Sequence, residues 1–189
     1  MIVTAKIEGR APLFHHSSRL VNPMLPEVKA FKIVNGITSK KKTDDSRKAE
    51  QDLEWLGGLY TDKPVEFSAE DRPPYRVVVE KTDARVVMPG DVVLAMVKRG
   101  ATMAKNGKNV ERGVVPCEEF YALDYDGPRQ VAKLFESAAH RDVRPAVMPS
   151  SGSRVMRCRP RFNRWALDFS LEILEDAEIT ADALKLAIE

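Results

Sequence analysis

Two neighbouring strands are predicted by residues 154–174, which read RVMRCRPRFNRWALDFSLEIL. Every other residue of the segment 165–173 is apolar, and the residues between them are small or charged. Because successive side chains of a strand point to opposite faces, this alternation predicts a strand with one buried face. Residues 154–162 are expected to form a hairpin with residues 143–148 across a Pro-Ser-Ser-Gly-Ser turn.

The rest of the chain mixes helical and strand patterns without regular alternation. Further strands are expected at 1–8, 28–34, 75–80 and 110–125, and helices at 45–60, 88–106, 126–139 and 180–188. Asp44 or Asp45, Asp91 and Thr180 are the expected helix caps, since their side chains can accept the free N–H groups of a first turn. Residues 61–75 are expected to be a surface loop. The pattern favours an α+β fold with helices on one face of a mostly antiparallel sheet.

Length and composition set broad limits. The 189 residues, 43% of them hydrophobic, suit a single domain over 1–189, with a candidate insertion at 61–87. No apolar run is long enough to cross a bilayer, and the first residues lack the apolar core of a secretory signal. Two cysteines, Cys117 and Cys158, form no disulfide framework. A cytoplasmic protein without contact to a membrane is expected.

Charge is distributed unevenly along the chain, although its net value is only +2. Residues 141–164 contain seven arginines and one acid, whereas residues 165–189 contain seven acids and one lysine. Such asymmetry bears on binding rather than on the fold.

The strongest local pattern is a row of arginines at every second position. Arg157, Arg159 and Arg161 would share one face of a strand, about 6.5–7 Å apart, close to the spacing of phosphates in an extended nucleic acid. Phosphates would relieve the repulsion between these like charges and release counterions. Two alternatives are open: a protein partner, or pairing within the chain with carboxylates of the next strand. Those carboxylates are Asp168, Glu172 and Glu175.

Other basic groups extend the candidate interface. A second cluster contains Lys40, Lys41 and Lys42, and a third lies in and after the helix predicted at 88–106. The full set of candidate nucleic-acid-binding residues comprises Arg154, Arg157, Arg159, Arg161, Arg164, Lys40, Lys41, Lys42, Pro89, Gly90, Lys98, Arg99, Lys105 and Lys108. The aromatic rings that could stack on bases, or else belong to the core, are Phe14, Tyr121, Tyr125 and Phe162.

His15 and His16 are the only paired histidines and weak candidates for catalysis. One of them could act as general acid or base in a metal-independent ribonuclease, although neighbours on an extended chain point in opposite directions. His/Cys/carboxylate groups with metal-ligand spacing are absent from the sequence, as are nucleotide-binding and hydrolase motifs. Neither a metal nor a cofactor is therefore expected.

One segment of the chain resembles a known family. Residues 88–99, MPGDVVLAMVKR, are similar to the start of the conserved helix of RAMP proteins, the RNA-binding backbone subunits of CRISPR effector complexes. The opening strand and loop, MIVTAKIEGRAPLFHHS, are similar to the start of such proteins, and RCRPRFNRW, residues 157–165, resembles phage and mobile-element relatives. This resemblance implies a ferredoxin-like or RRM-like core, with backbone contacts from Pro89, Gly90, Lys98 and Arg99. Asp91 and Ala95 depart from the family pattern.

These features favour a non-enzymatic protein that binds single-stranded RNA or DNA, mainly through phosphates. The first alternative is an assembly module, because a ferredoxin-like domain would need one more strand after the last helix. A second copy or another partner would then complete the sheet edge. The second alternative is the ribonuclease that uses His15 or His16.

Overall fold

The computed structural model describes residues 1–19, 22, 24–26, 28–30, 43–69, 76–147 and 152–188. The described chain is α+β, and all of its paired strands are antiparallel, as expected from the sequence. It divides into two compact units: unit 1 contains a five-stranded sheet, and unit 2 contains a three-stranded and a two-stranded sheet. Unit 1 comprises Met1–Ala11, Val87–Tyr125 and Arg164–Glu189, and unit 2 comprises Pro12–Val86 and Asp126–Asn163.

The sheet of unit 1 is built around the strand predicted most clearly by the sequence. β10 (Trp165–Ile173) pairs with the whole of β1 (Ile2–Glu8), from Ile2 opposite Glu172 to Glu8 opposite Ala166. The strand order is β1-β10-β7-β5, and β6 also pairs with β10. The remaining strands are β5 (Val87–Pro89), β6 (Val114–Pro116) and β7 (Phe120–Tyr125).

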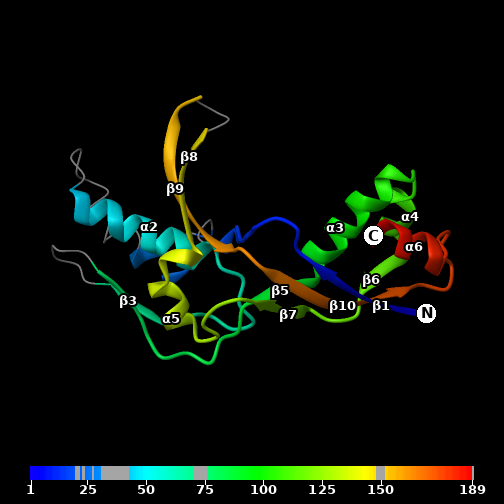
Figure 1. Cartoon of the computed structure of the whole chain (residues 1–189), viewed down its shortest axis with the longest axis horizontal. Helices are drawn as coiled ribbons and strands as arrows, with labels where there is room; N and C mark the ends of the chain where they lie inside the picture. Colours follow the sequence, from blue (N-terminus) through cyan, green and yellow to red (C-terminus); the bar gives the residue numbers. More distant parts are fainter. Residues whose placement is uncertain are drawn as a thin grey trace. The chain divides into compact units, whose positions relative to one another are not determined.

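Helices lie on one side of this sheet (Figure 1). They are α3 (Gly90–Met103), α4 (Gly107–Gly113) and α6 (Ala181–Ile188). α3 buries Val93, Val97 and Ala101 at the spacing of one helix face. α6 begins after Thr180, whose hydroxyl accepts a hydrogen bond from the N–H of Ala183 at 3.2 Å, so this predicted cap is confirmed.

The three-stranded sheet of unit 2 contains the predicted hairpin. β8 (Arg141–Val147) and β9 (Arg154–Phe162) pair from Arg141 opposite Pro160 to Val147 opposite Arg154. The short strand β2 (Leu13–Phe14) pairs with the end of β9 and completes the order β2-β9-β8. Figure 1 shows the far end of this hairpin extending away from the other elements of unit 2.

α2 (Asp44–Gly58) packs against β9 and holds the core of unit 2. Ala49, Leu53 and Leu56 are buried, as their spacing predicts. Trp55 is fully buried, and its indole N–H donates to the backbone oxygen of His140 at 2.7 Å. The other elements of the unit are β3 (Phe67–Ala69), β4 (Val77–Val79), α5 (Val131–Glu136) and the short 3-10 helix η2 (Ala138–His140).

Two of the predicted caps are wrong. Thr43, not Asp44 or Asp45, caps α2, because its hydroxyl accepts from the N–H of Ser46 at 3.2 Å. Asp91 lies inside the first turn of α3, where its carboxylate accepts from the N–H of Val92, and Pro89 occupies the cap position. Asp is favoured in a first turn as well as at a cap, so composition alone does not separate these positions.

Three predicted elements also differ. Val28–Ala30 is helical rather than extended, since the N–H groups of Val28 and Lys29 donate to Leu25, while 31–34 lies outside the described residues. Residues 110–113 belong to α4, not to a strand. The segment expected as a loop contains β3 and the buried Val65. In the last two cases contacts with other elements of the chain override local propensity.

The third helix is much shorter than predicted. Gly127 has a positive φ of 145°, outside the helical range, so a helix cannot begin at 126. A β-carbon at Gly127 would also lie 2.5 Å from the ring of His140, and only glycine leaves that space. The chain therefore forms a turn first, and α5 begins at Val131.

Candidate nucleic-acid interface

The sheet of unit 2 gathers arginines on one face. Cys158, Pro160 and Phe162 of β9 are buried, so the alternate residues Arg157, Arg159 and Arg161 lie on the opposite face, as predicted. The strand register adds three side chains, because residues directly opposite each other share a face. Arg144 lies opposite Arg157, Asp142 opposite Arg159, and Phe14 opposite Arg161. These six residues are called the arginine face below: Phe14, Asp142, Arg144, Arg157, Arg159 and Arg161.

Two of these arginines are neutralised by carboxylates. Arg144 forms an ion pair with the buried Asp142, and Arg157 forms one with Glu54 of α2. The guanidinium of Arg144 also lies over the ring of Phe14, 4.9 Å from its centroid. Both contacts hold these side chains against the sheet.

Arg159 and Arg161 remain uncompensated. Among the residues that the structure describes, neither has an ion-pair partner, and the Nε atom of each is buried without a hydrogen bond. Asp142, the residue opposite Arg159, already binds Arg144. Both side chains are only partly exposed, and as alternate residues of β9 they lie on the same face. Two adjacent cations of this kind attract anions.

The alternative of pairing with Asp168, Glu172 or Glu175 is not realised for Arg157. β9 pairs with β8 and β2, whereas β10 pairs with β1, β6 and β7, so the two consecutive strands belong to different sheets. The carboxylate that Arg157 binds comes instead from α2.

Glu54 binds β9 at two points. One carboxylate oxygen accepts from the guanidinium of Arg157, and the other accepts from the backbone N–H of Cys158 at 3.0 Å. β2 pairs only with Arg161 and Phe162, so Cys158 lies on the edge of β9 beyond that short strand. The Glu54 side chain is 11% exposed and Arg157 is 44% exposed. Glu54 therefore covers a strand edge that would otherwise be open.

The buried face of the hairpin is chemically inert. Arg141 forms an ion pair with Asp52 of α2, and its guanidinium lies 5.0 Å from the ring centroid of Phe135. Burial raises the pKa of Cys158 to about 11, although the nearby Arg141 acts in the opposite direction. The thiol is therefore protonated and unreactive at neutral pH.

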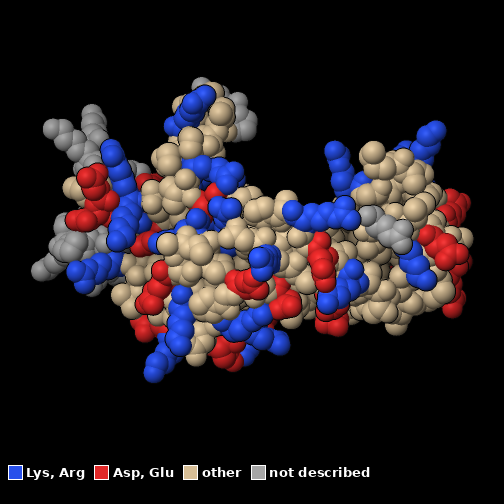
Figure 2. Space-filling view, in the orientation of Figure 1, with Lys and Arg blue, Asp and Glu red and all other residues tan. Residues whose placement is uncertain are grey.

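Beyond Arg159 the hairpin becomes a two-stranded arm. Val143, Val147 and Met156 are 45%, 62% and 52% exposed. The candidate residue Arg154 is exposed at the far end of β9, opposite Val147. Figure 2 shows basic side chains along this hairpin and at its tip.

His15 is a core residue of unit 2. It is 1% exposed, its ring lies 4.8 Å from that of Phe162, and its Nδ1 accepts from the N–H of Tyr60 at 3.3 Å. Burial lowers the pKa of His15 to about 3, so the ring is uncharged at neutral pH. His16 is exposed. The geometry gives the pair no common reaction centre.

The basic residues of unit 1 are mostly solvated. Lys98 forms an ion pair with Glu111 at 2.6 Å, while Arg99, Lys105 and Lys108 are exposed. The hydrogen bond from Lys98 lowers the pKa of Glu111. Arg164 begins the third segment of this unit and is exposed, with interactions of its own.

At the start of α3, the backbone N–H of Gly90 is bound by another part of the chain. The N–H of Gly90 donates to the backbone oxygen of Glu119 at 2.8 Å. A β-carbon at Gly90 would lie 2.5 Å from the backbone oxygen of Glu118, so this position requires glycine for packing. Pro89, at the cap position, has no N–H to donate. The backbone here is used within the protein rather than presented to a phosphate.

The open face of the unit 1 sheet is acidic. The register places Glu8, Asp124, Asp168 and Glu172 on the exposed side, together with one base, Lys6. RRM-type domains bind RNA on this kind of face by stacking bases on aromatic side chains. Carboxylates there would repel a phosphate backbone instead.

Of the four candidate stacking rings, three belong to the core. Tyr121, Tyr125 and Phe162 are buried, and only Phe14 is partly exposed. The hydroxyl of Tyr121 accepts from the N–H of Glu118 at 3.1 Å and donates to the backbone oxygen of Ser170. These contacts fix the ring between β7 and β10.

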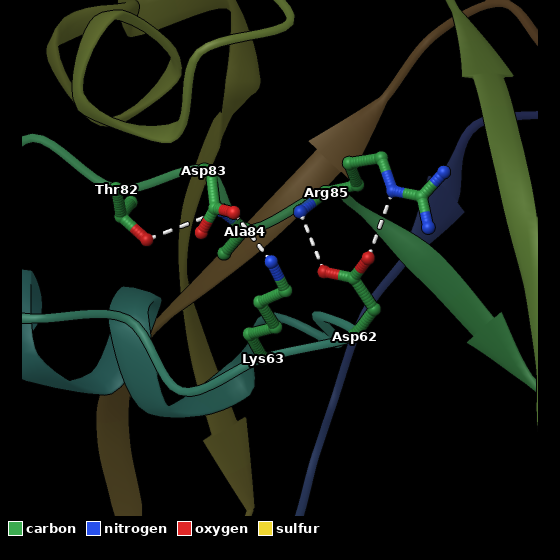
Figure 3. A network of polar contacts seen from close by, with 6 residues as sticks. All are labelled: Asp62, Lys63, Thr82, Asp83, Ala84 and Arg85. Carbon is green, nitrogen blue, oxygen red and sulfur yellow. Dashed lines mark hydrogen bonds and ion pairs between the residues drawn. The ribbon is translucent and has the colours of Figure 1, made fainter.

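A polar network in unit 2 joins two loops beside the bridge between Thr61 and Val86 (Figure 3). The carboxylate of Asp62 accepts from both the N–H and the guanidinium of Arg85 at 2.8 Å, and Lys63 pairs with Asp83. Burial acts to raise the pKa of Asp62, but the hydrogen bonds from Arg85 outweigh it and lower the pKa. The network links the two loops, and each of its acids forms an ion pair with a base of the network.

Sequence reasoning missed Glu54, which reaches β9 from α2 only through a tertiary contact. Phe14 was expected as a candidate ring and Arg144 lies in the predicted hairpin, but the contact between these two side chains could not be predicted. Asp52 carried a signal, since it lies three residues after Ala49 and four before Leu56 on the buried stripe of α2. An acid there requires a buried partner, which is Arg141.

The candidate residues Lys40, Lys41 and Lys42 lie outside the described residues. Within the described ranges, no three His, Cys, Asp or Glu side chains gather as metal ligands would. None of the helices that the structure describes has the length and apolar composition needed to cross a bilayer. Comparison of the chain with protein-family models, with curated proteins and with solved structures gives no match.

Proposed function

We propose that this protein binds single-stranded nucleic acid, RNA or DNA, along the arginine face and without catalysing a reaction. The observation that carries the proposal is the pair Arg159 and Arg161, two adjacent guanidinium groups without a carboxylate partner among the described residues. Their spacing along β9, about 6.5–7 Å, suits successive phosphates of an extended strand. Phosphate contacts of this kind supply most of the affinity of nonspecific binding.

The proposed mode of binding depends on phosphates rather than on bases. Phe14 is the only ring on the arginine face, and Arg144 already lies over it. Base stacking, which contributes most of the affinity in aromatic platforms, is therefore limited. The protein is expected to bind with weak sequence preference.

Finer features of the fold remain part of this proposal. The antiparallel sheet of unit 1, with helices on one side, supports a ferredoxin-like arrangement and a relation to RAMP proteins. The free thiols of Cys117 and Cys158 are compatible with action in the cytoplasm. In contrast to RRM-type domains, we place the nucleic acid on unit 2, because the open sheet of unit 1 is acidic.

The test is a titration of a fluorescein-labelled oligouridylate or oligodeoxythymidylate, followed by fluorescence anisotropy. Arg159→Ala/Arg161→Ala is expected to weaken binding on the order of tenfold at moderate salt, because two phosphates lose their partners. Lys133→Ala/Arg112→Ala is the matched control, since it removes two exposed cations that do not belong to the arginine face. Equal affinity of the Arg159/Arg161 variant and the wild type would refute the proposal.

A second candidate function is assembly by strand addition. β1 lies at the edge of the unit 1 sheet, and the exposed Ile2 lies at its start. An open edge can accept a strand from a second copy. Light scattering of the protein free of nucleic acid should then give a mass that rises with concentration and falls for Thr4→Pro, which puts a rigid ring without an N–H into β1. A constant monomer mass would exclude this candidate.

A further inference from the structure

The carboxylate of Glu54 accepts hydrogen bonds from two donors that could also bind another anion. One is the guanidinium of Arg157, and the other is the backbone N–H of Cys158, 3.0 Å from the second carboxylate oxygen. Arg157 is 44% exposed, so its side chain can be reached from solvent on the arginine face. The N–H of Cys158 is fixed in β9, on the edge that β2 does not cover.

The same two donors match a phosphate group. A phosphate offers several anionic oxygens and forms charge-assisted hydrogen bonds with a guanidinium and a backbone N–H, as a carboxylate does. Arg157 is also the next position in the row after Arg161 and Arg159, with the same two-residue spacing. A strand bound to Arg159 and Arg161 would therefore bring its next phosphate to Arg157.

We infer that Arg157 and the N–H of Cys158 form a third phosphate site, which Glu54 occupies in the free protein. This inference rests on the proposed function. It adds that Glu54 competes with the nucleic acid for these two donors. Because Glu54 is attached to α2 beside β9, its effective concentration at the site is high, and an incoming phosphate must displace it. Glu54 thus lowers the affinity for nucleic acid, and Arg157 contributes little while Glu54 is present.

The first experiment removes the competitor and keeps the fold. In Glu54→Gln the amide oxygen can still accept from the N–H of Cys158, but the charge that holds Arg157 is lost. The variant is expected to bind a fluorescein-labelled oligouridylate about tenfold more tightly than the wild type, the effect of one charge-assisted contact. Asp45→Asn is the matched control, because it makes the same change of charge at an exposed position of the same helix.

A double-mutant cycle distinguishes a gain in affinity that depends on Arg157 from a general effect of removing a negative charge. Adding Glu54→Gln to Arg157→Ala should change the affinity less than twofold, since the site then lacks its main donor. An equal gain in both backgrounds, or a gain no larger than that of Asp45→Asn, would overturn the inference. Glu54→Asp keeps the charge but shortens the side chain, so it should also tighten binding and provides a second variant if Glu54→Gln does not fold.

The outcomes distinguish this inference from the proposed function. If Arg159→Ala/Arg161→Ala weakens binding and the Glu54 variants behave as the wild type does, only the third site is excluded. If Arg159→Ala/Arg161→Ala leaves binding unchanged, the proposed function itself fails.

Discussion

At the scale of single residues, His15 links the stability of unit 2 to pH. Its ring is enclosed by Tyr60 and Phe162, and burial lowers its pKa from 6.5 to about 3. The unfolded chain takes up a proton near pH 6.5, which the folded chain does not take up until about pH 3. The contribution of His15 to stability is therefore complete above pH 6.5 and decreases as the pH falls towards 3.

This linkage predicts a measurable loss of stability in acid. The free energy of unfolding should fall by about 2 kcal/mol between pH 7 and pH 5 through His15 alone. His15→Gln, whose oxygen can replace Nδ1 as acceptor for the N–H of Tyr60, should show a smaller fall over the same range. Urea denaturation at both pH values measures the difference, and an identical fall in both proteins would contradict the assignment.

At the scale of elements, the first turn of α2 depends on one side chain. The hydroxyl of Thr43 accepts from the N–H of Ser46, which satisfies one of the free donors at the start of the helix. Thr43→Ala should lower the free energy of unfolding by about 1 kcal/mol. Asp45→Ala removes an acid from the same turn without breaking this bond and should cost less than half as much. Chemical denaturation measures both changes. If Asp45→Ala had the larger effect, the assignment of Thr43 as the cap of α2 would be wrong.

The elements also show how far the sequence determines this fold. β10 and the β8-β9 hairpin were predictable because their alternation and turn residues are local signals. Residues 110–113 were expected to be extended, and they are helical because Val110 is buried where α4 packs on α3. β3 is short and forms by pairing with β4. No local pattern in the sequence predicts this pairing.

In the candidate site, too, some features could be predicted from the sequence and others could not. The alternation of Arg157, Arg159 and Arg161 was visible in the sequence, since a strand has a fixed period. The neutralisation of Arg157 was not, because Glu54 reaches β9 from an element about a hundred residues earlier in the chain. Pairing of Arg157 with the next strand was one of the alternatives, and it does not occur because β10 belongs to another sheet.

At the scale of the whole molecule, a net charge of +2 hides a strongly uneven surface. Unit 1 presents carboxylates on its open sheet face, and unit 2 presents the arginine face with two uncompensated guanidinium groups among the described residues. Local charge rather than total charge decides where a polyanion binds. Binding should therefore depend on a few arginines, and the many exposed lysines should contribute little.

The salt dependence of binding tests this claim most directly. The logarithm of the association constant, plotted against the logarithm of the potassium chloride concentration, has a slope of about 0.7 for each phosphate neutralised on a single strand. For a single-stranded oligouridylate, Arg159→Ala/Arg161→Ala should reduce the magnitude of this slope by about 1.4 relative to the wild type. Equal slopes for the two proteins would show that these arginines do not contact phosphates and would contradict the claim.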